Sequence, residues 1–221
     1  MEFNFVKWIE HAGFLIEYEN TSIYIDPYRI RQPEKLPKAD LIFITHSHMD
    51  HLSLKDINAV SKSTTQLIAP KESINKLGAG AMAVEPGKSY TAKGIGFETI
   101  PAYNIKPERL NFHPKSNGWV GYIISIGKAR IFHAGDTDYT KEMESVSADL
   151  ALLPIGGTYT MSVDEAIEAA KGIKNVTYFA PMHYKALLGQ NGYAKAEEKF
   201  KNSVSNSLIF KQIQEPFFSL S

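Results

Sequence analysis

The stretch from Leu41 to Ser53, LIFITHSHMDHLS, concentrates side chains that bind metal ions. His46, His48 and His51 are three of the seven histidines in the chain, and Asp50 lies between the last two. Imidazole nitrogens and carboxylate oxygens are the usual zinc ligands where no thiolate is present. The chain contains no cysteine, so any metal site in it must use histidine and carboxylate.

The spacing within this stretch suits two neighbouring ions. Residues two apart in an extended segment share a face, so His46 and His48 can bind one ion together. Asp50 and His51 come where the chain turns toward a predicted helix, so their side chains can diverge to a second ion. The alternative is a solvated histidine-rich loop. It accounts less well for the four ligand-type residues that directly follow an apolar segment.

Two metal sites need more ligands than this stretch supplies. Asp136 follows an apolar segment and a glycine in FHAGDTDY, a tight turn from which a carboxylate can approach an ion closely. His183 ends another apolar segment, APMHY. Functional residues collect in the loops at strand ends on α/β scaffolds, so both positions are strong candidates. The other histidines that could take part are His11, His113 and His133.

A succession of strands and helices must position these residues. Apolar and alternating segments predict strands over 3–9, 13–19, 21–28, 39–45, 65–70, 81–87, 94–102, 119–126, 129–134, 148–157 and 175–184. Helical patterns cover 53–62, 72–78, 161–172 and 193–204. Ser53 and Ser162 are predicted N-caps, Ser162 with Glu165 as its capping-box partner, and Gly172 is predicted to end its helix. The order predicts an α/β or α+β fold with helices outside a sheet core.

Composition limits the class of protein. The chain has 221 residues, 43% of them apolar and 22% charged, which is typical of one globular domain spanning 1–221. Its formal net charge is zero, which disfavours nucleic-acid binding, although a local basic patch could exist. The first ten residues carry three charged side chains and do not resemble a signal peptide. No apolar run is long enough for a membrane span, so we expect a cytoplasmic protein.

The motifs THSHMDH, AGDT and the late PMHY, in this order, resemble the metallo-β-lactamase superfamily over nearly the whole chain. The resemblance implies a four-layer αβ/βα sandwich, with two facing sheets, helices outside and a dinuclear site at one edge. The early HAGFLIEYENTSIYIDPY is similar to one branch of the superfamily. That branch contains ascorbate-6-phosphate lactonase-like and N-acyl-phosphatidylethanolamine phospholipase D-like proteins.

Carried onto this sequence, the resemblance implies a ligand set for two divalent ions. His46, His48 and a third histidine would hold the first ion. Asp50, His51 and His183 would hold the second, and Asp136 would bridge the two. Zinc is the default for such ligands, and manganese, iron or nickel are alternatives. Asp136 and Asp50 are the residues to which the resemblance gives a catalytic role.

The third histidine of the first site is either His113 or His133. Family members carry it ahead of the GDT motif, in a place that His113 fits. His133 lies three residues before Asp136, inside a predicted strand, where relatives often carry an aromatic residue. We therefore predict His113 as the ligand and His133 as a packed imidazole or one that supports a ligand.

Other residues near the motifs have predicted supporting roles. Asp26 matches an early motif of the superfamily and is predicted to be a buried acceptor that orients the histidine loop. Alternatively, Asp26 only forms a turn before Pro27. His11 is predicted to lie at the mouth of the site or to be structural. Four residues could contact substrate but are expected to form walls of the site: Tyr103, Asn104, Lys115 and Tyr184.

The predicted function is metal-dependent hydrolysis of a small ester, lactone or phosphodiester by water activated between two ions. A nuclease and a non-enzymatic metal-binding protein are the alternatives. The histidine at position 48 disfavours the di-iron flavoprotein branch, which usually carries glutamate there, and antibiotic hydrolysis is disfavoured by the missing signal peptide. The expected partner is a small-molecule substrate, with no nucleic acid and no membrane span. Homo-oligomers remain compatible with the sequence.

Overall fold

The computed structural model describes residues 2–78 and 80–214. The chain divides into two compact units. The N-terminal unit comprises Met1–Val84 and Phe210–Ser221, and the C-terminal unit comprises Glu85–Ile209. The predicted single domain over 1–221 stays a prediction.

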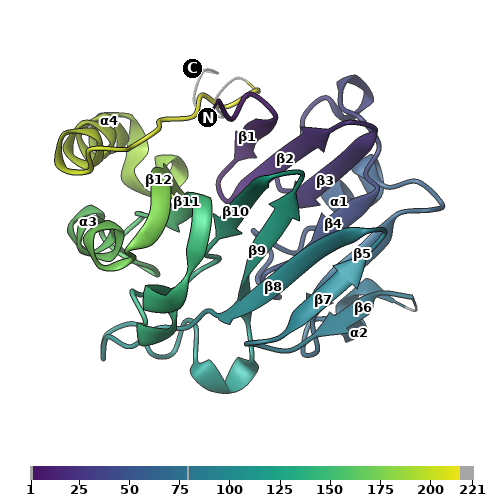
Figure 1. Cartoon of the computed structure of the whole chain (residues 1–221), viewed down its shortest axis with the longest axis horizontal. Coiled ribbons are helices and arrows are strands. Elements are labelled where there is room, and N and C mark those ends of the chain that lie inside the picture. The colour runs from purple at the N-terminus through teal and green to yellow at the C-terminus, as the bar shows by residue number, and fades with distance from the viewer. Residues whose placement is uncertain (1, 79, 215–221) are drawn as a thin grey trace. The chain divides into compact units, whose positions relative to one another are not determined.

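The N-terminal unit is built on a six-stranded sheet in which the strands follow one another in sequence order (Figure 1). The strands are β1 (Val6–Glu10), β2 (Gly13–Tyr18), β3 (Thr21–Ile25), β4 (Leu41–Phe43), β5 (Gln66–Pro70) and β6 (Met82–Val84). The first three pair antiparallel, and β3 to β6 pair parallel. The parallel arrangement brings the carboxyl ends of β3, β4 and β5 to one edge, where the histidine loop begins.

The core of this unit explains why its sheet and first helix form. Leu41, Ile42 and Phe43 of β4 are all fully buried, as expected of a short apolar strand within a parallel sheet. Helix α1 (Leu54–Val60) contributes Ile57 and Val60 to the same apolar cluster as Ile42. Its cap is as predicted, because the Ser53 side chain accepts a hydrogen bond from the Asp56 backbone N–H. Helix α2 (Ile74–Leu77) is a single turn.

The C-terminal unit contains a second six-stranded sheet, in the order β12-β11-β10-β9-β8-β7. Its strands are β7 (Ser89–Ala92), β8 (Ile95–Pro101), β9 (Val120–Ile126), β10 (Ala129–His133), β11 (Ser147–Pro154) and β12 (Asn175–Met182). Strands β7 to β10 pair antiparallel, and β10 to β12 pair parallel. The sequence prediction missed β7, whose residues Ser89 to Ala92 are mostly exposed and lack a strong apolar pattern.

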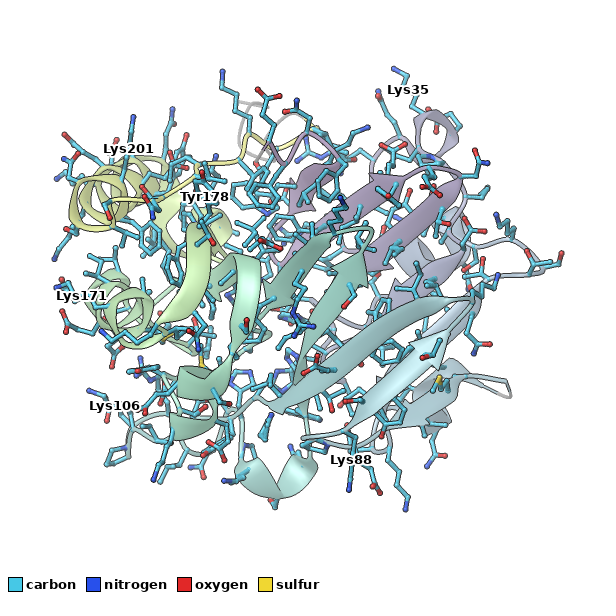
Figure 2. The ribbon with its side chains drawn as sticks, viewed as in Figure 1. Lys35, Lys88, Lys106, Lys171, Tyr178 and Lys201 are labelled. Carbon is cyan, nitrogen blue, oxygen red and sulfur yellow. The ribbon has the colours of Figure 1, made fainter. Side chains whose placement is uncertain are left out.

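Two helices accompany this sheet, with α3 (Val163–Gly172) beside α4 (Lys185–Ser203) and α4 against β12 (Figure 1). Figure 2 shows Lys171 and Lys201 on the exposed sides of these helices. The predicted capping box of Ser162 and Glu165 is present. Gly172 is the last residue of α3, so its predicted place at the helix end is confirmed. A glycine is needed there since a Cβ would overlap the Tyr139 hydroxyl.

Helix α4 begins eight residues earlier than predicted and bends at Gly189, whose φ of 64° is not helical. Short 3₁₀ turns cover Pro33–Lys35, Lys115–Asn117 and Lys141–Ser145. None of the helices in the described part of the chain has the length and apolar character that a membrane crossing requires. The two sheets and their helices make the mixed α/β fold that the sequence predicts.

Candidate functional site

The histidine loop leaves β4 in the N-terminal unit and places two imidazoles together. His46 Nε2 lies 3.1 Å from His48 Nδ1, and the ring centroids are 4.7 Å apart. Two nitrogen ligands of one tetrahedral zinc ion are roughly 3.3 Å apart, given the usual zinc–nitrogen distances. The predicted pairing of His46 with His48 is therefore compatible with one shared ion.

A buried carboxylate organises the start of this loop. Asp26, fully buried, accepts hydrogen bonds from the Thr45 backbone N–H at 2.8 Å and the Thr45 hydroxyl at 2.6 Å. Because that hydroxyl donates to Asp26, it accepts from His46 Nδ1, 2.9 Å away. The lone pair of His46 is then on Nε2, the nitrogen that faces His48.

Asp26 also fixes His51. The His51 Nδ1 lies 2.7 Å from Asp26 Oδ2, and both side chains are fully buried. With Nδ1 donating to Asp26, the lone pair of His51 is on Nε2, which lies 3.9 Å from Asp50 Oδ2. The structure thus places Asp26 as an acceptor behind two candidate ligands, in the manner of groups that orient metal-binding histidines.

His11 lies beside the Asp50 carboxylate. Its Nε2 is 3.1 Å from Asp50 Oδ2, and His11, Asp50 and His51 each offer a ligand atom within 4.8 Å of the others. Both His11 (φ 54°) and Asp26 (φ 44°) have left-handed backbone conformations, which are uncommon for residues other than glycine. The Trp8 indole N–H donates a hydrogen bond to the His11 carbonyl oxygen at 2.9 Å. His11 therefore belongs to the cluster of ligand-type residues.

In the C-terminal unit, three ligand-type residues meet at Asp136, which follows β10. Asp136 Oδ2 lies 3.3 Å from His113 Nε2 and 3.1 Å from His183 Nε2. All three side chains are buried. His183 directly follows β12 and has a φ of 57°, and a Cβ at Gly156 would overlap the His183 carbonyl, so this turn requires a glycine at position 156. Each of the two nitrogen–oxygen distances to Asp136 is compatible with a pair of ligands on the same cation.

His133 has a different neighbour. It is fully buried on β10, and its Nδ1 accepts a hydrogen bond from the Gly135 N–H at 3.2 Å. The Nε2 atoms of His113 and His183 lie at Asp136. The choice of His113 over His133 as the ligand stays a prediction.

The candidate wall residues Tyr103, Lys115 and Tyr184 are engaged elsewhere. The Tyr103 hydroxyl donates to Glu142 Oε2 at 2.9 Å, and the Lys115 ammonium lies 4.3 Å from the Tyr103 ring centroid. A hydrogen bond from Lys115 lowers the pKa of Glu142. The Tyr184 hydroxyl donates to Glu197, and burial raises its pKa. The two hydroxyls therefore bond to glutamates, and the role of these residues as walls of the site stays a prediction.

Several buried polar residues were not singled out from the sequence. Thr45 connects Asp26 to the histidine loop, and Asp138, Arg109 and Glu165 form a buried ion-paired group. Asp138 had a recognisable signal, since it lies two residues after Asp136 in the GDTD stretch. Arg109 had none, because a single arginine in a loop resembles an ordinary exposed residue.

Comparison with known proteins defines the class. A family model described as "Beta-lactamase superfamily domain" matches residues 5–183, so the chain belongs to the β-lactamase superfamily. A UPF0173 metal-dependent hydrolase of Thermoplasma volcanium is 34% identical over 96% of this chain and 97% of its own length. The predicted superfamily is thereby confirmed, and so is the predicted class of enzyme, a metal-dependent hydrolase.

Solved structures agree with the fold. The solved structure of a protein of Parabacteroides distasonis is 34% identical to this chain and has a TM-score of 0.83. The match covers 94% of this chain and 92% of that one. Igni18, a metallo hydrolase of Ignicoccus hospitalis, is 24% identical, with a TM-score of 0.74 and 94% of both chains covered. The fold class of the metallo-β-lactamase type is confirmed. The likeness to the lactonase-like and phospholipase D-like branch stays a prediction.

Proposed function

We propose that this metal-dependent hydrolase uses water activated by two divalent ions, zinc by preference, on a small ester, lactone or phosphodiester. The observation that carries the proposal is that three candidate ligands, His46, His51 and His113, have Nδ1 at a protein oxygen. Each therefore presents Nε2 in the form that binds a metal. Such orientation is typical of metal-binding histidines, and a solvated histidine-rich loop has no need of it.

The ligand assignment follows the superfamily pattern and is part of the proposal. In that pattern, His46, His48 and His113 would hold one ion, Asp50, His51 and His183 would hold the other, and Asp136 would contribute to both. We further propose that residues 1–221 form one functional domain, in keeping with the family model that matches residues 5–183. His11 supports Asp50, in keeping with their 3.1 Å separation.

The donor set fits cations. In the C-terminal unit, the Nε2 lone pair of His113 faces a carboxylate oxygen of Asp136 at 3.3 Å. In the N-terminal unit, the Nε2 of His51 similarly faces Asp50 at 3.9 Å. Two electron-rich atoms at these distances repel each other unless a cation or a proton lies between them. Nitrogen and carboxylate ligands without sulfur suit zinc, manganese, iron or nickel.

Residues of the chain would assist the ions in the proposed hydrolysis. Divalent ions held here would lower the pKa of a water molecule and polarise a carbonyl or phosphoryl oxygen. Asp136 would orient the attacking water through a carboxylate oxygen. Asp26 and Thr45 keep the histidine loop in one geometry, so little reorganisation is needed during the reaction. Burial of these groups strengthens their electrostatic interactions.

The test begins with metal content. Elemental analysis of protein purified without chelators is expected to find two divalent ions per chain. A panel of generic esters, lactones and phosphodiesters is then screened with defined metal loading. Asp136→Ala should lose turnover by at least about 100-fold, and circular dichroism should show that the fold survives. Wild-type protein with neither bound metal nor tight rebinding would contradict the proposal.

The same screen separates the alternatives. A non-enzymatic metal-binding protein would bind ions but turn over none of the panel. A nuclease would bind RNA or DNA with an affinity that falls steeply with salt. We expect a small-molecule substrate, because the acidic and basic residues balance at 24 each. A cytoplasmic location also stays a prediction.

A further inference from the structure

A chain of buried polar groups runs behind His113 in the C-terminal unit. His113, Asn104, Asp138 and Arg109 are each at most 4% exposed. His113 Nδ1 lies 2.6 Å from Asn104 Oδ1, and Asn104 Nδ2 lies 3.1 Å from Asp138 Oδ1. Arg109 Nη2 then lies 2.8 Å from the same Asp138 oxygen. Burial of polar groups costs free energy unless each is hydrogen-bonded, so these contacts are needed to offset that cost.

The orientation of the Asn104 amide follows from its surroundings. Its Nδ2 is within hydrogen-bonding distance of Asp138 Oδ1 and of the Tyr159 carbonyl oxygen, at 3.1 and 3.0 Å. Both of these atoms accept hydrogen bonds, so only the NH₂ group of Asn104 can face them. A flipped amide would place its oxygen against two acceptors. The Asn104 oxygen must therefore face His113.

Asp138 is surrounded by hydrogen-bond donors. Its Oδ2 accepts from the backbone N–H groups of Ile105 at 2.8 Å and Lys106 at 2.9 Å. The guanidinium of Arg109, which can only donate, lies 2.8 Å from Oδ1. Asp138 therefore accepts from the Asn104 amide, and these donors hold it in that role.

Arg109 connects this group to the start of α3. Its guanidinium makes two hydrogen bonds to Glu165, at 2.9 and 2.8 Å, and a third to the Thr160 carbonyl at 2.6 Å. Burial alone would raise the pKa of Glu165, but hydrogen bonds from Arg109, Ser162 and Lys106 lower it to about 2. Figure 2 labels Lys106, whose ammonium lies 3.1 Å from Glu165. The position of Arg109 is therefore fixed on several sides.

We propose that Asn104 is a positioning residue that fixes the tautomer and ring orientation of His113. This inference rests on the proposed role of His113 as a metal ligand. Because the Asn104 oxygen can only accept, His113 must carry its proton on Nδ1 and present the lone pair of Nε2. Asp138 and Arg109 in turn support Asn104, because they prevent its amide from flipping. Asn104 thereby does for His113 what Asp26 does for His51.

The proposal predicts a specific failure when the acceptor is removed. In Asn104→Leu, a substitution of similar volume, His113 loses the amide oxygen that lies 2.6 Å from its Nδ1. Its proton should move to Nε2, where Asp136 Oδ2 lies 3.3 Å away and can accept it. That proton occupies the lone pair which would bind the ion. Loss of a group that supports a ligand typically weakens metal binding by about 10- to 100-fold.

The experiment measures zinc affinity and the His113 tautomer separately. Zinc affinity is measured by competition with a chromophoric chelator for wild type, Asn104→Leu and the control Thr99→Val. Thr99 is a buried residue of β8 whose hydroxyl donates to the backbone carbonyls of Glu85 and Lys88, which are not part of the polar group behind His113. The tautomer is assigned from long-range proton–nitrogen correlations of the imidazoles in metal-free protein at pH 9.

The inference expects three results together. Wild-type His113 carries its proton on Nδ1, Asn104→Leu moves it to Nε2, and only Asn104→Leu loses about 10-fold or more in zinc affinity. An Nε2 proton in the wild type, or an unchanged tautomer in Asn104→Leu, would overturn it. Equal affinity losses in Asn104→Leu and Thr99→Val would do so too. Wild-type protein that binds no zinc contradicts the proposed function instead, and the tautomer measurement still decides the role of Asn104.

Discussion

At the scale of single residues, the imidazoles of His51 and His113 have the same kind of support in different units. His51 meets the carboxylate of Asp26, and His113 meets the amide oxygen of Asn104. In both cases the supported nitrogen is Nδ1, so Nε2 is the nitrogen offered to an ion. The two candidate ligands differ in the group that supports them, a carboxylate for His51 and an amide for His113. A carboxylate partner makes the imidazole a more basic ligand than an amide partner does.

The choice between His113 and His133 leads to a prediction at this scale. His113→Ala should reduce the metal content from two ions per chain toward one, because it removes a nitrogen that lies 3.3 Å from Asp136. His133→Ala should keep both ions, since His133 Nδ1 is bonded to the Gly135 N–H. Elemental analysis of the folded fraction measures both variants. Full metal content in His113→Ala, with loss in His133→Ala, would reverse the assignment.

At the scale of elements, the candidate ligands lie where strands end. His46 follows β4, Asp136 follows β10 and His183 follows β12. Each of these strands is paired in parallel with a neighbour, so its carboxyl end lies at the same sheet edge as that of its partner. The turn after each strand must then change direction sharply, and the left-handed backbone of His183 is one result.

The capping box of α3 gives a prediction at this scale. In Ser162→Ala, the Glu165 backbone N–H loses its side-chain acceptor at 3.3 Å, while the bond from the Ser162 N–H to Glu165 remains. We expect a loss of about 1 kcal/mol in the free energy of unfolding. Urea denaturation measures the change. Ser162→Thr keeps the oxygen and serves as the control, so an equal loss in both variants would argue against the capping role.

At the scale of the whole molecule, the formal net charge is zero, but some of the charged residues are concentrated in one group of ion pairs. Arg109, Asp138 and Glu165 form a largely buried ion-paired group within one unit, while many lysines lie exposed on the surface. Breaking such a buried group by removing one partner is far more destabilising than breaking a surface pair. The stability of the molecule in acid should therefore depend on this group.

The pH dependence of stability follows from Glu165. Its pKa is about 2 in the folded chain, against an ordinary value of 4.5. The stabilisation is thus fully present above pH 4.5 and is lost as the pH falls from 4.5 toward 2. We expect a contribution of about 1–2 kcal/mol, because solvent screens the exposed quarter of the side chain.

Urea denaturation between pH 2 and 6 measures this contribution. Glu165→Gln should be less stable than wild type at pH 6, and the difference should shrink toward pH 2. Lys171→Gln is the control, because Lys171 forms an exposed i,i+3 pair with Glu168. A constant difference between Glu165→Gln and wild type over this range would rule out ionised Glu165 as the source.

Local patterns in the sequence determined the elements and most candidate ligands. Apolar runs set the strands, Ser53 and Ser162 set two helix starts, and the HSHMDH spacing indicated metal binding, because these features depend on neighbours along the chain. The exceptions were β7 and the early start of α4. The sequence also gave no sign that position 172 must stay free of a Cβ, because Tyr139, the side chain that needs the space, lies 33 positions earlier.

Only the tertiary structure decided how the ligands are held. Asn104 was predicted as a wall residue, yet its orientation depends on Asp138, 34 positions away, and on the Tyr159 carbonyl, 55 away. Arg109 and Glu165 are separated by 56 positions. Hydrogen bonds of this kind require the burial and exact placement that packing provides, and no short-range pattern encodes them. The sequence determined which groups could bind metal, and the folded chain determined which nitrogen His46, His51 and His113 present.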